Sequence, residues 1–151
     1  MKNVMVVIDE SNSSYDLLIW VLENLKDITE SSKVFIFAKQ PQNSFTSPSV
    51  GFAQFCYPLS PNVQLIRLAQ EKNTKIALGI LEKAKKICGN HGIKAETFTD
   101  VGDPEDSVRK IIQERKIDLF VISDQQNRNL ERSLQKTDCS LLVVKKIFSK
   151  N

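Results

Sequence analysis

Apolar runs alternate with amphipathic segments along the chain. The first run, Val4 to Ile8, is continuous and ends at Asp9, which is typical of a parallel strand buried on both faces. Three further apolar runs and one polar, alternating stretch predict four more strands, at 33–38, 95–101, 118–122 and 141–144. The polar stretch, 95–101, suits the edge of a sheet.

Between these strands, apolar residues recur every three or four positions and predict helices. Ser13 and Asp16 fit a capping pattern that marks the start of the first helix. The longest helix is expected over about 63–88, with Gly79 allowing close packing inside it. Asp103 is the expected N-cap of the next helix, and a short helix is expected before the last strand.

This order of elements predicts a single α/β domain over residues 1–151, with an open parallel five-stranded sheet and helices on both faces. Ligands in such sheets bind beyond the carboxyl ends of the strands, where the strand order switches. The candidate nucleotide-binding residues at strand ends are therefore Val7, Ile8, Asp9, Ala38, Val101, Ile122 and Ser123.

A segment rich in prolines and aromatic residues, from about Gln40 to Pro61, is not expected to form a regular element. Phe45, Phe52 and Phe55 give it more aromatic surface than a plain linker carries. Two interpretations stay open: a loop folded over the end of the sheet, or a lid or partner-binding flap. A lipid or small hydrophobic ligand under these rings is also left open.

Composition narrows the function further. The net charge is +3, with Lys and Arg scattered along the helices, which indicates solvated faces rather than a nucleic-acid site. No apolar run approaches the roughly 20 residues of a membrane span, and no signal-peptide pattern opens the chain, so we expect a cytoplasmic protein. Three cysteines without short spacing and a single histidine, His91, favour neither a metal site nor a catalytic thiol. We therefore expect no catalytic residues and no enzymatic activity.

No glycine follows Gly102. In a nucleotide-binding α/β fold, the strand at 118–122 would lead into a glycine-rich loop whose backbone N–H groups surround the phosphates. Here it leads into Ser123, Asp124 and further polar side chains, and Asp124 adds a negative charge. The sequence predicts that the phosphate-binding loop has been lost.

In order along the chain, several stretches resemble the universal stress protein A family, and its plant members in particular. These stretches are 4–11, 38–41, 94–97, 102–104, 118–122 and 139–145, with the aromatic insertion after the second strand. The resemblance covers nearly the whole chain. It implies a flavodoxin-like or Rossmann-like sheet of the adenine nucleotide alpha hydrolase type, ATP or AMP at the strand ends in many members, dimers through the last strand, and no agreed enzymatic reaction.

Carried over by position, Asp9 matches the acid that holds the ribose hydroxyls, and Ala38 matches a position whose backbone meets the adenine. The family pattern Gly-x-x-Gly, nine residues, Gly-Ser would begin at Ser123. Counting forward puts Gln126 at the second glycine and Lys136 and Thr137 at the Gly-Ser pair. Counting back from the last strand puts Asn127 and Arg128 there instead, and neither count finds a glycine. Two lost phosphate hydrogen bonds, at roughly 1.5–3 kcal/mol each, would turn a micromolar site into a millimolar one or worse.

The leading interpretation is a non-enzymatic stress-response module with a degenerate ATP site and no cofactor, acting through dimerisation or a partner. An alternative is an atypical AMP or ATP site in which adenosine lies over Asp9 and Ala38 while Arg128 or Arg132 meets a single phosphate. A third is a receiver-like phosphoryl acceptor at Asp124, with Mg²⁺ on Asp9 and Glu10 and with Lys145 beside the phosphoryl group.

The last strand is apolar on both faces and carries no proline or charge that would protect an edge. We expect it to pair with a second copy across a two-fold axis. The candidate interface residues are Leu141, Leu142, Val143 and Val144.

Overall fold

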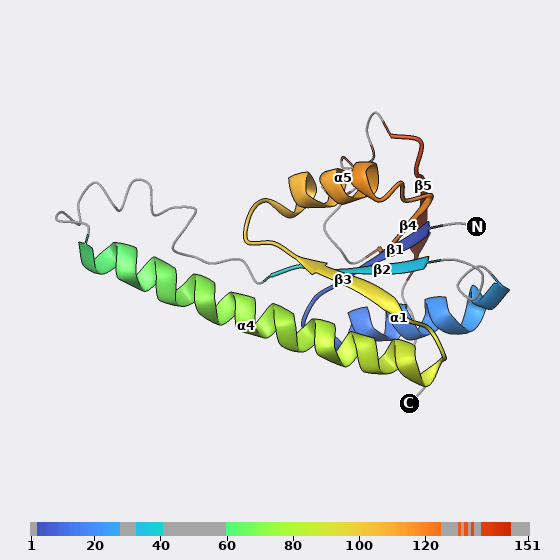
Figure 1. The fold of residues 1–151 in the computed structure, drawn as a ribbon, viewed down its shortest axis with the longest axis horizontal. Helices are drawn as coiled ribbons and strands as arrows, with labels where there is room; N and C mark the ends of the chain where they lie inside the picture. Colours follow the sequence, from blue (N-terminus) through green and yellow to red (C-terminus); the bar gives the residue numbers. More distant parts are fainter. Residues whose placement is uncertain are drawn as a thin grey trace.

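The computed structural model of the chain describes residues 3–27, 33–40, 60–124, 130, 132, 134 and 137–145, and for residues 60–66 it describes the backbone alone. Five parallel strands form one sheet in the order β3-β2-β1-β4-β5 (Figure 1). They are β1 (Asn3–Ile8), β2 (Lys33–Ala38), β3 (Ala95–Thr99), β4 (Leu119–Ser123) and β5 (Ser140–Val144). The predicted α/β class and five-stranded parallel sheet are confirmed, with β3 at one edge as its polar sequence indicates.

The helices are α1 (Asn12–Asn24), α4 (Ser60–Asn90) and α5 (Pro104–Glu114). Side chains alternate across β1, so Val4, Val6 and Ile8 pack with α1 and α4, whereas Met5 and Val7 pack with α5. Figure 1 shows α1 and α4 on one face of the sheet and α5 on the other. All five of these β1 residues are fully buried, which explains why the sequence of β1 is apolar throughout.

Two helix starts differ from the prediction. The N-cap of α1 is Ser11 rather than Ser13, because the Ser11 side chain accepts from the backbone N–H of Ser14. Helix α4 begins at Ser60, inside the segment predicted to be irregular, since a proline fits the first turn of a helix, where no N–H donor is needed. Residues 41–59 of that segment lie outside the described residues.

Gly79 was expected to permit close packing, and the structure shows otherwise. A Cβ built at Gly79 would meet no heavy atom within 4 Å. Between β4 and β5, where a short helix is predicted, the structure describes only Asp124, Leu130, Arg132, Leu134 and the stretch from Thr137. Leu130 is buried and Leu134 half-buried in the α5 layer. None of the described helices has both the length and the apolar content of a membrane span.

Candidate functional site

The strand order reverses between β1 and β4, and this is where open parallel sheets bind their ligands. From β1 the chain adds β2 and β3 on one side and then returns to place β4 on the other. The residues paired between β1 and β4 end at Val6 and Val121, whereas β1 continues to Ile8 and β4 to Ser123. The turns that follow these strands form the candidate site.

Asp9 stabilises the turn between β1 and α1. Its Oδ1 accepts hydrogen bonds from the Ser11 backbone N–H at 2.8 Å and from the Ser11 hydroxyl at 2.5 Å. The buried Ser14 hydroxyl lies 2.8 Å from the carbonyl oxygens of both Asp9 and Ser11, and it accepts from the Asp9 N–H at 3.2 Å. Asp9 Oδ1 therefore stabilises the turn, whereas none of the described residues donates a hydrogen bond to Asp9 Oδ2.

Tyr15, on the first turns of α1, lies beside this carboxylate. Burial and, to a smaller degree, the Asp9 charge raise the pKa of the Tyr15 phenol. The Lys83 ammonium of α4 lies 4.1 Å from the centre of the Tyr15 ring. Tyr15 therefore stays protonated at neutral pH and links the Asp9 turn to α4.

The end of β2 is joined to the end of β3 by side chains. The Thr99 hydroxyl donates to the Ala38 carbonyl at 2.9 Å and accepts from Gln40 Nε2 at 3.3 Å. The Lys39 N–H donates to the Ile8 carbonyl at 2.8 Å, which fixes β2 against β1. The Ala38 carbonyl thus already has one hydrogen-bond donor, and a carbonyl oxygen has a second lone pair for another.

Asp100 stabilises the turn from β3 into α5. Its Oδ2 accepts from the Ser107 hydroxyl at 2.8 Å, and its Oδ1 accepts from the backbone N–H groups of Val101 at 2.7 Å and Gly102 at 3.4 Å. The Ser107 bond, with these amides and the charge of Lys110, lowers the pKa of the Asp100 carboxyl. Asp103 caps α5, as predicted, by accepting from the Glu105 N–H at 3.1 Å.

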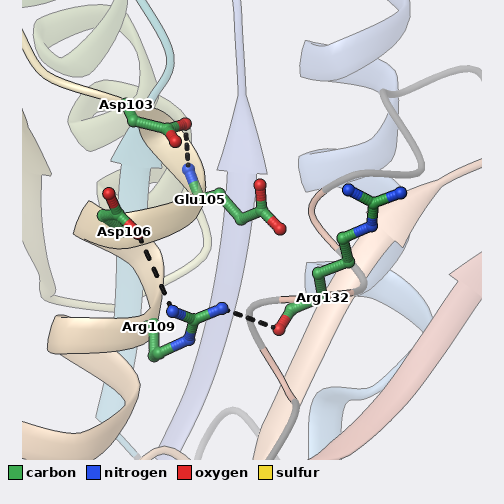
Figure 2. Close-up of polar contacts among 5 residues, drawn as sticks. All are labelled: Asp103, Glu105, Asp106, Arg109 and Arg132. Atoms are coloured by element: carbon green, nitrogen blue, oxygen red, sulfur yellow. Dashed lines mark hydrogen bonds and ion pairs between the residues drawn. The ribbon is translucent and has the colours of Figure 1, made fainter.

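Arg109 connects α5 to the segment before β5. Its guanidinium donates to the Arg132 carbonyl at 3.1 Å and lies 3.7 Å from an Asp106 oxygen. Figure 2 shows the Arg132 side chain running from that carbonyl to the level of the Glu105 carboxylate while leaning away from α5. Arg132 is exposed, and it lies at the carboxyl edge of the sheet together with the acidic residues at the start of α5.

The family model of the universal stress protein family matches residues 1–145. The chain belongs to the universal stress protein family. Its fold is similar to that of a universal stress protein from Arabidopsis thaliana with AMP bound, at 18% identity over 97% of this chain and 93% of that one, with a TM-score of 0.67. It is also similar to UspA from Lactobacillus plantarum (12%, 95% and 97%, TM-score 0.66) and to the Archaeoglobus fulgidus protein in complex with dAMP (15%, 96% and 98%, TM-score 0.62). No curated protein matches the chain.

In this universal stress protein, the predicted nucleotide-binding residues fall into three groups. Asp9, Ala38 and Ser123 stand at the carboxyl ends of their strands, and Val101 is 54% exposed in the turn after β3. Three others are buried: Val7, Ile8 and Ile122. Ala38 is buried as well, so that only the backbone of these four residues could meet a ligand. The remaining two, Asn127 and Arg128, lie outside the described residues.

Sequence reasoning missed four residues that organise this edge: Ser14, Gln40, Thr99 and Asp100. Strand β3 ends at Thr99, two residues before the predicted end at Val101. The signal for Thr99 and Asp100 was a polar pair at the end of an alternating strand. No sequence signal marks Gln40, because its contact depends on how β2 and β3 are aligned.

The receiver-like arrangement is not formed. Asp9, Glu10 and Asp124 do not gather into a metal-binding cluster, and the described part of the chain contains no group of three or more His, Cys, Asp or Glu side chains that could hold a metal ion. The Asp124 N–H donates to the Val144 carbonyl at 3.1 Å. Asp124 therefore stands at the end of β4 without the acidic partners that Mg²⁺ would require.

An open hollow of about 410 Å³ lies at the other end of the sheet, where the strands begin. Asn3, Lys33 and Phe35 line it together with the ion pair of Arg115 and Glu96, whose atoms are 3.3 Å apart. No predicted site residue lies there. The carboxyl edge therefore remains the candidate site.

Strand β5 ends the sheet next to β4, as the dimer prediction requires. The Ser140 N–H donates to the Asp118 carbonyl, and the Val144 carbonyl accepts from Asp124. Successive residues of a strand direct their backbone N–H and C=O groups to opposite sides. Leu142 therefore directs its groups toward β4, as Ser140 and Val144 do, whereas Leu141 and Val143 direct theirs away from β4. Leu141 and Leu142 are half-buried, Val144 is buried and Val143 is 39% exposed.

Proposed function

We propose that this universal stress protein is a non-enzymatic stress-response module whose ATP site is degenerate, and that it acts in the cytoplasm through self-association along β5 or through a protein partner. The observation that carries the proposal is the absence of any glycine after Gly102. Without glycine after β4, each residue that would have to bring its backbone N–H group close to the phosphates carries a side chain.

Charge at the carboxyl edge supports the loss of triphosphate binding. Asp9, Asp100 and Asp124 follow β1, β3 and β4, and Asp103 begins α5. Of these, Asp100, Asp103 and Asp124 are exposed. Because like charges brought together without a compensating cation are destabilising, a polyanion is disfavoured at this edge.

Two observations support a non-enzymatic role. The only histidine, His91, has its Nδ1 2.9 Å from the Ile87 carbonyl at the end of α4, so it sits before β3 and not at the carboxyl edge. Burial raises the pKa of both described thiols, Cys88 and Cys139, to about 11. Neither thiol is a ready nucleophile at neutral pH.

Calorimetric titration with ATP and Mg²⁺ tests the proposal. We expect no binding below about millimolar ATP, since two phosphate hydrogen bonds are missing. Micromolar binding of ATP would overturn the degenerate-site proposal. The non-enzymatic role is checked in parallel by ATP hydrolysis assays, in which turnover above the level of an Asp9→Ala variant would contradict it.

A second candidate function is binding of an adenosine monophosphate. It is favoured by Asp9 Oδ2, to which no described residue donates a hydrogen bond, by the second lone pair of the Ala38 carbonyl and by the exposed Arg132 side chain, which Figure 2 shows at the level of Glu105. Two similar proteins hold AMP and dAMP, each with one phosphate. In the same calorimeter, micromolar AMP binding that Arg132→Ala weakens and Arg132→Lys partly restores would establish this function.

A further inference from the structure

Helix α4 is too long for the sheet that it covers. Its 31 residues span about 46 Å, whereas strands of five or six residues span about 17–20 Å. Figure 1 shows the N-terminal half of α4 projecting past the sheet. Among residues 67–90, the fully buried positions begin only at Ala77. An isolated half-helix is marginal in water, and none of the described side chains from 67 to 76 is buried, so a partner surface would stabilise this half.

The outward face of α4 is not purely polar. Leu68 is 60% exposed and Leu78 is 55% exposed, and they are two of the four large hydrophobic residues exposed on the described part of the chain. Glu71 and Lys75 lie between them. Spacings of three, four and three residues keep these four side chains within a stripe about 80° wide on the helix. We call Leu68, Glu71, Lys75 and Leu78 the α4 stripe.

The α4 stripe is complementary to itself. The pairs Leu68 with Leu78 and Glu71 with Lys75 share one midpoint, at position 73. If two copies cross antiparallel with a two-fold axis at that level, Leu68 of one copy meets Leu78 of the other, and Glu71 meets Lys75, each contact occurring twice. Among the described residues, neither Glu71 nor Lys75 forms an ion pair, so both charges are available for such a contact.

We propose that the α4 stripe is an antiparallel contact surface for a second copy of this chain. Charge complementarity selects this occupant, because the order Leu, Glu, Lys, Leu set against its own reverse places Leu opposite Leu and Glu opposite Lys. The contact is separate from the proposed β5 pairing and rests on α4 alone, so either can fail without the other.

The test is sedimentation equilibrium in a Val143→Pro background, which removes pairing through β5. We expect this variant still to associate, and Leu68→Ser, Glu71→Lys and Lys75→Glu each to weaken association about tenfold. The decisive sample is an equimolar mixture of the Glu71→Lys and Lys75→Glu chains. In the mixed pair both ion contacts are opposite in charge, so association returns to the starting level, which a change confined to one helix could not produce.

Lys110→Glu is the matched control, because it reverses an exposed charge on α5, across the sheet, and should leave association unchanged. Circular dichroism verifies that each variant is folded. A monomeric Val143→Pro chain at all concentrations, or a mixture no more associated than its components, overturns the α4 contact. If the chain without Val143→Pro associates no more strongly than the Val143→Pro chain, only the proposed β5 dimer is overturned.

Discussion

The Ser107 hydroxyl donates a 2.8 Å hydrogen bond to Asp100 Oδ2, and this bond ties the first turns of α5 to the end of β3. It favours the ionised carboxylate and is the main reason that the pKa of Asp100 lies below its usual value. A carboxyl whose pKa is lowered on folding stabilises the fold above its unfolded pKa. That stabilisation is lost as the pH falls below about 4 and through the folded pKa.

Ser107→Ala should therefore lower the free energy of unfolding by about 1 kcal/mol at pH 7. The difference from the natural chain should shrink as the pH falls from about 4, the unfolded pKa, through the lower pKa of folded Asp100. Urea unfolding at pH 7 and pH 3 measures both effects. Ser140→Ala is the control, since that exposed side chain makes no hydrogen bond among the described residues. A difference that stays constant with pH would contradict the assignment to Asp100.

Replacement of Asp9 separates its structural role from its charge. Asp9→Ala removes the acceptor for the Ser11 N–H and hydroxyl, and should lower the free energy of unfolding by about 1–2 kcal/mol. Asp9→Asn keeps an oxygen acceptor without the charge and should retain most of the stability. Thermal unfolding of the three chains measures this. Equal losses in both variants would show that the charge, and not the turn, is what matters.

Two glycine-to-alanine substitutions should have opposite signs although neither residue is crowded. A Cβ at Gly79 or at Gly92 meets nothing within 4 Å, but Gly92 has a φ of +72°. Gly79→Ala, in the interior of α4, should raise the free energy of unfolding by about 0.5–1 kcal/mol. Gly92→Ala should lower it by about 1 kcal/mol, because alanine is strained in the left-handed region. Urea midpoints of the two variants check the contrast, and a shift of the same sign in both would refute it.

Proline substitutions in β5 distinguish the side of the strand that faces away from β4 from the side that hydrogen-bonds to β4. The Val143 N–H is directed away from β4, so Val143→Pro should leave the sheet intact while preventing a second copy from pairing there. Leu142→Pro removes a bond toward β4 and should destabilise the chain by several kcal/mol, of the order of 3. Light scattering and thermal unfolding give the two readouts. If Val143→Pro left the β5-dependent association unchanged, pairing through β5 would be ruled out.

Much of the fold could be predicted because single residues or short runs decide it locally. Val4 to Ile8 is apolar at every position, which is typical of a strand covered on both faces. Asp103 followed by proline fixes the start of α5 without help from the rest of the fold.

The start of α1 and the side-chain contacts of the candidate site depend on contacts that the sequence pattern does not encode. Ser11 and Ser13 are both suitable caps, and the choice falls on Ser11 because Asp9 Oδ1 accepts its N–H and hydroxyl. In the candidate site, the Thr99 hydroxyl reaches the Ala38 carbonyl only because β2 and β3 pair these two residues directly. Such a register is set by the whole sheet, so hydrophobic periodicity finds the strands but not the side chains that join their ends.

The central place of β1 has a consequence for amide hydrogen exchange. Val4 to Ile8 are flanked by β2 and β4 and covered by both side-chain layers, so their amides should exchange only when the entire domain opens. Asp9 is attached directly to that slowest-exchanging segment, and Ser11 and Ser14 already hold its turn. A ligand held by Asp9 would therefore bind to backbone that is ordered beforehand, and little of its binding free energy would be spent on ordering this turn.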